Sequence, residues 1–460
     1  MVLSVYCLLL KIYTLNRKYK IKGGDKMNRI KKYRVKYRNK LTLLQCMIIT
    51  VIIIALIWAQ RSIADFIQVP LTVFIIQLFF LTLVWFGFYY KSRYSFSEVQ
   101  RLKAKLFHVI KSNKLFLESN DDGHKRTYST LAFYFYQQKN SLFVEAHAKG
   151  DSYTKKSADL RVELESALDL TLVEKDATHP SFTCYEFALR KINRLQFLSP
   201  ADIPKENETI QLDEEKVWKP YRAPHILIAG TTGAGKSYTI FILLLQMARQ
   251  GWDIYIADPK QNDLASLRFS IPNGESHIAS TPPRIAKMVR EVVELMNERN
   301  NTYFNSSDSA MGKDYRHYKL RPIILVFDEV ASFQEMDKKI GAEVMSYLKQ
   351  IIMMGRQVGV FLLIATQRPD HNAFDTAIRD QFGLRIALGK MSSIGFKMTL
   401  GEFEELPSSL YGNEVGTGYI LIDGEGWSNP RSFQSAYIDM DAINYQETLK
   451  RFLMVNQQED

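Results

Sequence analysis

Cysteine is scarce in this sequence. The 460 residues include only Cys7, Cys46 and Cys184, which stand far apart and in unlike contexts. A disulfide framework needs an even set of cysteines, and a structural zinc site needs ligands in short paired spacings. The sequence therefore predicts neither a disulfide-stapled fold nor a cysteine-based metal centre.

Acidic residues are also in deficit. Lysine and arginine number 60 against 49 aspartates and glutamates, which gives a formal net charge of +11. An excess of this size suits a polyanionic partner or an anionic membrane surface. The alternative is that basic residues merely flank membrane segments, and their distribution accounts for a good part of the excess.

Two long apolar runs, residues 41–59 and 67–90, lack the polar face that a core helix of a water-soluble domain would show. Each is long enough to cross about 30 Å of hydrocarbon. Lysines and arginines crowd the flanks of this pair, whereas the link between the runs carries only Arg61 and Asp65 as charges. The positive-inside rule then predicts a multi-pass cell-membrane protein with a two-helix transmembrane hairpin (41–90) and with both termini in the cytoplasm.

The basic segment 1–40 is expected to be a cytoplasmic N-terminus. Residues 22–27, Lys-Gly-Gly-Asp-Lys-Met, can be encoded by a strong bacterial ribosome-binding site followed by a start codon. We therefore expect translation to begin at Met27, with residues 1–26 not translated.

Residues 91–220 carry the pattern of a small cytoplasmic α+β domain. After a basic, helix-compatible stretch, alternating and helical patterns follow one another in the order β-β-α-β-β. These patterns cover residues 127–136, 141–147, 157–168, 169–173 and 182–189. No catalytic constellation is visible, so assembly or partner docking is the expected role.

A complete phosphate-loop motif follows at residues 230–237. Its pattern GxxxxGK[ST] stands between an apolar strand pattern (225–229) and an amphipathic helix pattern (238–249). Successive N–H groups of such a loop cradle phosphate oxygens at the helix N-terminus. Nucleotide-binding residues are therefore expected to be Gly230, Thr231, Thr232, Gly233, Ala234, Gly235, Lys236 and Ser237. A plain glycine-rich turn is the alternative.

Two roles in the loop follow from side-chain chemistry. Lys236 supplies a cation for the β and γ phosphates of ATP, and the Ser237 hydroxyl is a ligand for Mg²⁺. The apolar run 323–327 ends in Asp328 and Glu329, where Asp328 would hold the magnesium shell and Glu329 would polarise the attacking water. Downstream of a phosphate loop, this weak acidic signal becomes a strong one.

Three further features lie in the same half of the chain. A buried strand pattern (360–367) ends in Gln367, which would sense the γ-phosphate; a glutamine that merely caps the strand is the alternative. The strand pattern 253–258 ends in Asp-Pro-Lys, polar residues at the edge where parallel sheets bind ligands. The irregular stretch 301–320 is basic, with Lys313, Arg316, His317, Lys319 and the adjoining Arg321, and reads either as a loop facing an acidic polymer or as a solvated loop.

Taken together, residues 222–440 resemble the motor domain of the FtsK/SpoIIIE family of membrane-anchored DNA-pumping ATPases. The resemblance lies in the ordered set of motifs: the strand and phosphate loop at 224–237, Asp-Pro-Lys at 258–260, Gly355-Arg356, and Ala-Thr-Gln-Arg-Pro at 365–369. It implies a RecA-like P-loop NTPase core with a parallel sheet, acting as a hexameric ring on DNA. By motif position, Arg356 is the candidate arginine that completes a neighbouring subunit's site.

The layout is similar to the FtsK-like coupling proteins of conjugative elements, the TcpA and ConQ group. A hairpin, a small domain, one motor (221–440) and a short tail (441–460) leave no room for the winged helix of the chromosome-segregating members. The resemblance implies DNA translocation toward a type IV secretion-like channel, with a relaxase as partner. Alternatives are movement of chromosomal DNA in segregation and movement of protein substrates in secretion. A non-hydrolysing scaffold is disfavoured because Lys236, Asp328 and Glu329 are all present.

Overall fold

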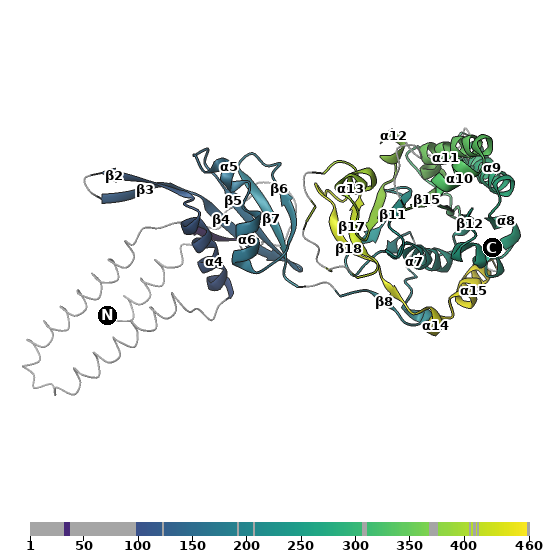
Figure 1. Cartoon of the computed structure of the whole chain (residues 1–460), viewed down its shortest axis with the longest axis horizontal. Helices are drawn as coiled ribbons and strands as arrows, with labels where there is room; N and C mark the ends of the chain where they lie inside the picture. The colour runs from purple at the N-terminus through teal and green to yellow at the C-terminus, as the bar shows by residue number, and fades with distance from the viewer. Residues whose placement is uncertain are drawn as a thin grey trace, which may run out of the picture. The chain divides into compact units, whose positions relative to one another are not determined.

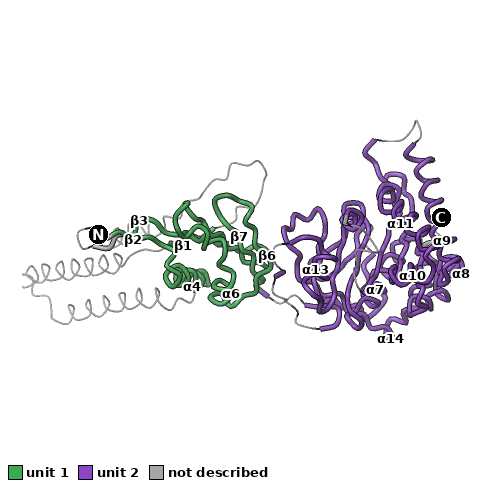
Figure 2. The backbone as a smooth tube through the Cα atoms, turned by 45° about the horizontal axis from the view of Figure 1, so that its top comes forward, with its two compact units in different colours: residues 1–189 green, residues 190–460 purple. Residues whose placement is uncertain are grey.

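The computed structural model describes most of the chain as two compact units, residues 1–189 and 190–460 (Figure 2). The described residues are 32–36, 98–121, 124–190, 193–205, 208–305, 311–367, 376–403, 406–407, 411 and 414–457. The expected spans at 41–59 and 67–90, and the expected untranslated residues 1–26, lie outside these ranges. Within the described ranges, none of the helices combines the length and apolar character that a membrane crossing requires.

Unit 1 is built on a five-stranded antiparallel sheet with the order β1-β4-β5-β7-β6. One face of the sheet packs against helices α4 and α6 (Figure 1), where Phe133 and Phe135 of β4 share a buried cluster with Leu164 of α6. The elements are β1 (Tyr33–Lys36), α4 (Glu98–Ser112), β4 (Ala132–Gln138), β5 (Ser141–His147), α5 (Thr154–Ser157), α6 (Arg161–Leu168), β6 (Leu172–Asp176) and β7 (Phe182–Ala188).

The strand β1 comes from the segment that we expected to be only a basic N-terminal flank. It pairs antiparallel with β4, Tyr33 opposite Phe135 and Val35 opposite Phe133. The Lys103 ammonium of α4 lies 5.4 Å from the centroid of the Tyr33 ring. Residues on both sides of the segment 37–97 therefore belong to one folded unit, and the small domain is not confined to residues 91–220.

A second difference concerns the run 127–136, expected to be one strand. It forms parts of two strands, because β3 (His124–Thr130) pairs with β2 (Phe116–Asp121) whereas β4 belongs to the main sheet. Leu131 separates them, is fully buried, and donates its N–H to the Leu115 carbonyl at 2.9 Å. Alternation continues through Leu131, so the sequence pattern gave no sign of the break.

Unit 2 has an eight-stranded sheet with the order β13-β12-β14-β15-β11-β16-β17-β18. The first six strands are parallel to one another. β17 pairs antiparallel with β16, and β18 antiparallel with β17. The sheet is therefore mixed and not wholly parallel as expected. The strands are β13 (Ile278–Ala279), β12 (Asp253–Ala257), β14 (Ile323–Asp328), β15 (Val360–Thr366), β11 (Ile226–Gly230), β16 (Leu384–Leu388), β17 (Thr417–Ile422) and β18 (Arg431–Gln434).

Helices cover both faces of this sheet. On one face lie α7 (Lys236–Arg249) and α15 (Tyr445–Gln457), and on the other lie α9 (Pro282–Arg299), α10 (Val330–Met336) and α11 (Lys338–Val358) (Figure 1). Side chains of one strand alternate between the two cores: Phe361 and Leu363 pack on the α7 side, and Leu362 on the α11 side. Continuous apolar strands are what a parallel sheet buried on both faces requires.

Unit 2 extends beyond the expected motor domain, residues 221–440, at both ends. It begins at Arg190, because β8 (Gln196–Phe197) pairs with β19 (Tyr437–Ile438), and Trp218 of β10 (Val217–Trp218) is fully buried in its core. The expected tail contains α14 (Met440–Ile443) and α15, and the Tyr445 hydroxyl donates to the Phe241 carbonyl of α7 at 3.0 Å. Residues 441–457 are thus part of unit 2 and not a separate tail.

A buried histidine ties the start of β11 to its neighbours. His225 is fully buried; its Nδ1 accepts the Leu362 N–H at 3.1 Å, and its Nε2 donates to the Ile352 carbonyl at 3.1 Å. The ring is therefore neutral, and burial lowers the pKa of His225 to about 4. It joins the strand before the phosphate loop to β15 and α11.

Replacing His225 by alanine should lower the free energy of unfolding by about 3 kcal/mol, because two buried backbone groups lose their partners. Denaturant unfolding of the purified chain, followed by tryptophan fluorescence, measures this: Trp218 and Trp252 both pack against Phe361, which neighbours the histidine. The control is the exposed His108→Ala in unit 1. Equal stability of the two variants would refute the role.

The same histidine predicts a pH dependence. Between pH of about 6.5 and about 4 the unfolded chain binds a proton at His225 that the folded chain does not. The free energy of unfolding must therefore fall as the pH drops through this window. This contribution should be present in the natural chain and absent from the His225→Ala variant.

Candidate nucleotide site

The phosphate loop lies where the sequence predicts it, between β11 and α7. Gly233 and Gly235 adopt positive φ angles of 78° and 100°, a conformation that residues with a Cβ rarely adopt. Space is a second constraint at Gly235, since an added Cβ would lie 2.9 Å from the Gly416 nitrogen. The loop thus needs glycine for its backbone turn and for its packing.

Lys236 turns back over the loop at the first residue of α7. Its Nζ donates to the Gly230 carbonyl at 2.6 Å and lies 3.4 Å from the Thr231 carbonyl. Burial lowers the pKa of Lys236, while the nearby Asp328 and Glu329 act in the opposite direction. The ammonium therefore lies between the loop and the acidic pair, while Ser237 is exposed at the helix start.

The carboxyl ends of β12 and β14 bring two aspartates together. Asp258 is fully buried and accepts the N–H groups of Lys260 at 3.2 Å and Ala265 at 3.0 Å. Burial, with Asp258 and Glu329 nearby, raises the pKa of Asp328 to about 6. This crowding of negative charge favours a bound cation.

Glu329 is held in a fixed orientation. Its Oε1 accepts the Thr366 hydroxyl at 3.3 Å, its Oε2 accepts the Gln367 N–H at 3.1 Å, and the Lys260 Nζ lies 3.7 Å from Oε2. Glu329 also has a φ of 58°, a left-handed conformation that costs a non-glycine residue about 1–3 kcal/mol. Backbone and side chain are thus both constrained at the residue expected to polarise water.

The predicted sensor Gln367 directly follows β15, beside the phosphate loop, since Thr366 pairs with Ala229. Its backbone N–H holds Glu329, and its side chain is exposed. The structure therefore assigns the backbone of Gln367 to positioning Glu329. The sensing role of the side chain stays a prediction.

Arg356 lies at the amino ends of the strands, opposite the phosphate loop at their carboxyl ends. It is in the last turn of α11, just before β15 begins, and its Nε donates to the Tyr221 carbonyl at 3.1 Å. The seven residues of β15 span roughly 20 Å between this edge and the phosphate loop. The structure therefore does not bring Arg356 to the site of its own chain.

Two arginines of the basic stretch that was expected to face a polymer already form ion pairs within the fold. Arg316 forms ion pairs with Asp314 at 2.8 Å and Glu208 at 3.1 Å, and its guanidinium lies 3.7 Å from the centroid of the Tyr221 ring. Arg321 lies 3.9 Å from Asp253. Both arginines are therefore committed within the fold, which favours the solvated-loop alternative for them.

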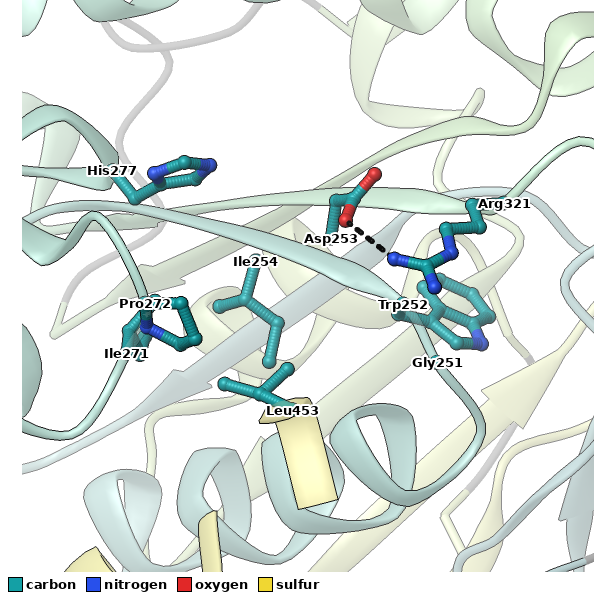
Figure 3. Close-up of a pocket in the computed structure, with 9 residues that line it drawn as sticks. All are labelled: Gly251, Trp252, Asp253, Ile254, Ile271, Pro272, His277, Arg321 and Leu453. Atoms are coloured by element: carbon teal, nitrogen blue, oxygen red, sulfur yellow. Dashed lines mark ion pairs between the residues drawn. The ribbon is translucent and has the colours of Figure 1, made fainter. Parts of the chain in front are cut away.

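A pocket also lies at the amino end of β12, away from the phosphate loop (Figure 3). Asp253 and Arg321 form its ion pair, and Leu453 of α15 lies near Ile254. None of the predicted nucleotide-site residues line it. Its lining residues are Gly251, Trp252, Asp253, Ile254, Ile271, Pro272, His277, Arg321 and Leu453.

The site fits ATP with a divalent cation better than it fits a metal alone. Among the described residues, no group of three or more His, Cys, Asp or Glu side chains is arranged to hold a metal ion. A cation beside Asp328 would therefore depend on phosphate oxygens and on Ser237 for its remaining ligands. A magnesium ion bound with a nucleotide would have these ligands, and it would neutralise charge on the phosphates.

Three contributors were not predicted as site residues. Lys260 and Asp258 stand in a motif that the sequence did single out, but no role followed from it. Thr366 gave no signal, because a threonine at a strand end is common and its contact with Glu329 crosses between two strands. Spacing in the sequence cannot reveal such contacts between neighbouring strand ends.

Comparison with known proteins agrees with this geometry. Residues 190–312 match the model of the FtsK/SpoIIIE family. The chain carries an FtsK/SpoIIIE-family domain. This domain is a P-loop ATPase domain, as the resemblance implied.

Curated relatives share the FtsK/SpoIIIE domain. The FtsK domain-containing protein YdcQ of Bacillus subtilis is 33% identical over 315 residues, which cover 68% of this chain and 64% of that protein. DNA translocase FtsK of Caldanaerobacter subterraneus is 28% identical over 249 residues, 51% of this chain and 32% of that protein. The chain thus spans less than two thirds of either relative.

Two solved structures match this chain at lower sequence identity. The pCW3 conjugation coupling protein TcpA, with ATPγS, is 20% identical, covers 70% of this chain and 93% of that chain, and has a TM-score of 0.49. EssC of Geobacillus thermodenitrificans is 18% identical, with 58% and 52% covered and a TM-score of 0.45.

Proposed function

We propose that this protein is a membrane-anchored ATPase that translocates DNA and serves as the coupling protein of a conjugative element. The observation that carries the proposal is the convergence of Lys236, Asp328 and the oriented Glu329 at one edge of the sheet. Such a site can bind a triphosphate, hold its cation and activate water. Mg²⁺ is the cation we propose, with Ser237 and Asp328 as its ligands.

DNA as the polymer is supported by the relatives whose printed name is DNA translocase FtsK. The net charge of +11 suits the same class of partner. Conjugation is the finer part of the proposal and rests on the layout expected from the sequence, with a relaxase and a type IV secretion-like channel as partners. A hexameric ring is proposed on the family resemblance.

Anchoring in the membrane is supported by the apolar runs at 41–59 and 67–90. β1 and α4, which stand on either side of residues 37–97 in the sequence, both belong to unit 1. A connection whose two ends are held by one folded body must cross a bilayer an even number of times. This agrees with a hairpin whose two flanks lie in the cytoplasm.

Purified full-length protein in detergent should hydrolyse ATP faster when DNA is added, and the stimulation should weaken as salt rises, because DNA binding releases counterions. Lys236→Ala should lower hydrolysis roughly a hundredfold or more. The exposed Lys349→Ala on α11 is the matched control and should behave as the natural chain.

In donor cells, Lys236→Ala should also abolish transfer of the element while the protein still inserts in the membrane. ATP hydrolysis that neither single-stranded nor double-stranded DNA stimulates would contradict the DNA proposal and favour a protein cargo. Normal transfer with Lys236→Ala would contradict the motor role.

A further inference from the structure

A short segment before β17 packs directly against the phosphate loop. The Gly416 N–H donates to the Ala234 carbonyl at 2.9 Å, and an added Cβ on Gly235 would lie 3.2 Å from Val415 Cγ1. Val415 therefore lies beside the loop that cradles the phosphates, although it is far from that loop in sequence.

Hydrogen bonds fix this segment on both sides of Val415. The Thr417 hydroxyl donates to the Glu414 carbonyl at 2.6 Å, and the Gln434 side-chain amide donates to the Glu414 carboxylate at 2.9 Å. The Gly416 carbonyl accepts the Ser435 N–H at 2.8 Å. These hydrogen bonds therefore fix the position of the backbone at Val415.

Despite this support, the Val415 side chain is 58% exposed. Tyr238, the residue after the phosphate loop, is 54% exposed. An exposed valine is unremarkable on an ordinary surface. Here the apolar surface adjoins a phosphate site, where a bound nucleotide has an aromatic base that gains by leaving water.

The side chain of Arg194 lies next to the same segment. The Arg194 Nε donates to the Ser435 carbonyl at 2.9 Å, and its guanidinium lies 5.8 Å from the centroid of the Tyr437 ring. A Cβ added at Gly416 would lie 2.9 Å from Arg194 Nη2, so the guanidinium is next to the segment. Guanidinium groups both stack on aromatic rings and donate to the oxygens of a sugar or to the ring nitrogens of a base.

We propose that Glu414, Val415 and Gly416, together with Arg194, form the nucleoside subsite of the ATP site, with Val415 covering one face of the base. The inference rests on the proposed function, since it extends the same site beyond the phosphates. Bound ATP would then contact two segments that are far apart in the sequence: its phosphates the phosphate loop, and its base the residues just before β17.

The test compares binding of ATP and of inorganic triphosphate, each with magnesium, to the full-length chain by calorimetry. Val415→Ser should weaken ATP binding roughly tenfold, because a contact worth about one buried aliphatic group is lost. Binding of inorganic triphosphate should not change, because it has no base. Val162→Ser, at a 72% exposed valine of α6, is the matched control.

Unchanged ATP binding by Val415→Ser would overturn the subsite. Equal weakening of ATP and triphosphate binding would also overturn it, because the residue would then act through the phosphate loop. If the natural chain binds neither ligand, the phosphate site itself fails, and with it both the proposed function and the subsite. Binding of triphosphate as tight as ATP would refute the subsite alone.

Discussion

Glu329→Gln should lower the turnover of ATP by roughly two to four orders of magnitude, the contribution that a positioned general base makes. Glutamine keeps the size of the side chain: its amide oxygen can still accept the Gln367 N–H, and its amide NH2 can donate to the Thr366 hydroxyl oxygen. It loses the charge that polarises water. ATP binding should therefore persist while hydrolysis stops.

Single-turnover hydrolysis and equilibrium binding of ATP separate these effects. The control is Glu335→Gln, an exposed glutamate in α10, the helix that Glu329 precedes. Comparable hydrolysis by Glu329→Gln and the control would show that another group activates water. Loss of ATP binding by Glu329→Gln would instead assign the residue to nucleotide retention.

Arg356→Ala should reduce ATP hydrolysis about a thousandfold, the lower range for an arginine that stabilises charge in phosphoryl transfer. The residue lies roughly 20 Å from the phosphate loop of its own chain. We therefore expect it to act on the site of a neighbouring subunit. Coexpression of Arg356→Ala with Lys236→Ala should restore part of the activity that neither variant has alone.

The recovery follows from the arrangement of sites. An intact Lys236 on the first variant can meet an intact Arg356 on the second, whereas each variant alone lacks one of the two groups. A chain that carries both substitutions is the control, because it should rescue neither single variant. Activity that stays absent in the mixed assembly would exclude this arginine from a shared site.

The phosphate loop and the acidic pair could be predicted because each is a local pattern: an apolar run followed by the residues that end it. The roles of Lys236 and Glu329 could be predicted from the residues immediately around them. The support of Glu329 by Thr366 and Lys260 could not be predicted in this way, because strand order decides which strand ends are neighbours.

The same reason explains the errors in the fold. The four residues of β1 stand in a run of basic residues, whose charge pattern is typical of a membrane flank and hides a strand. Its partner β4 lies far along the chain, and long-range pairing leaves no local periodicity. The antiparallel pairing of β17 with β16, and of β18 with β17, likewise leaves no local pattern.

Pairing of β1 with β4 also has a mechanical consequence. If residues 37–97 are the anchor of a motor under load, tension reaches unit 1 at two points, through β1 and through α4. Pulling along β1 would load its four residue pairs with β4 together, in shear, and α4 would carry the remainder through its packing on the same sheet. Unit 1 would then share the pulling force between two attachment points, β1 and α4.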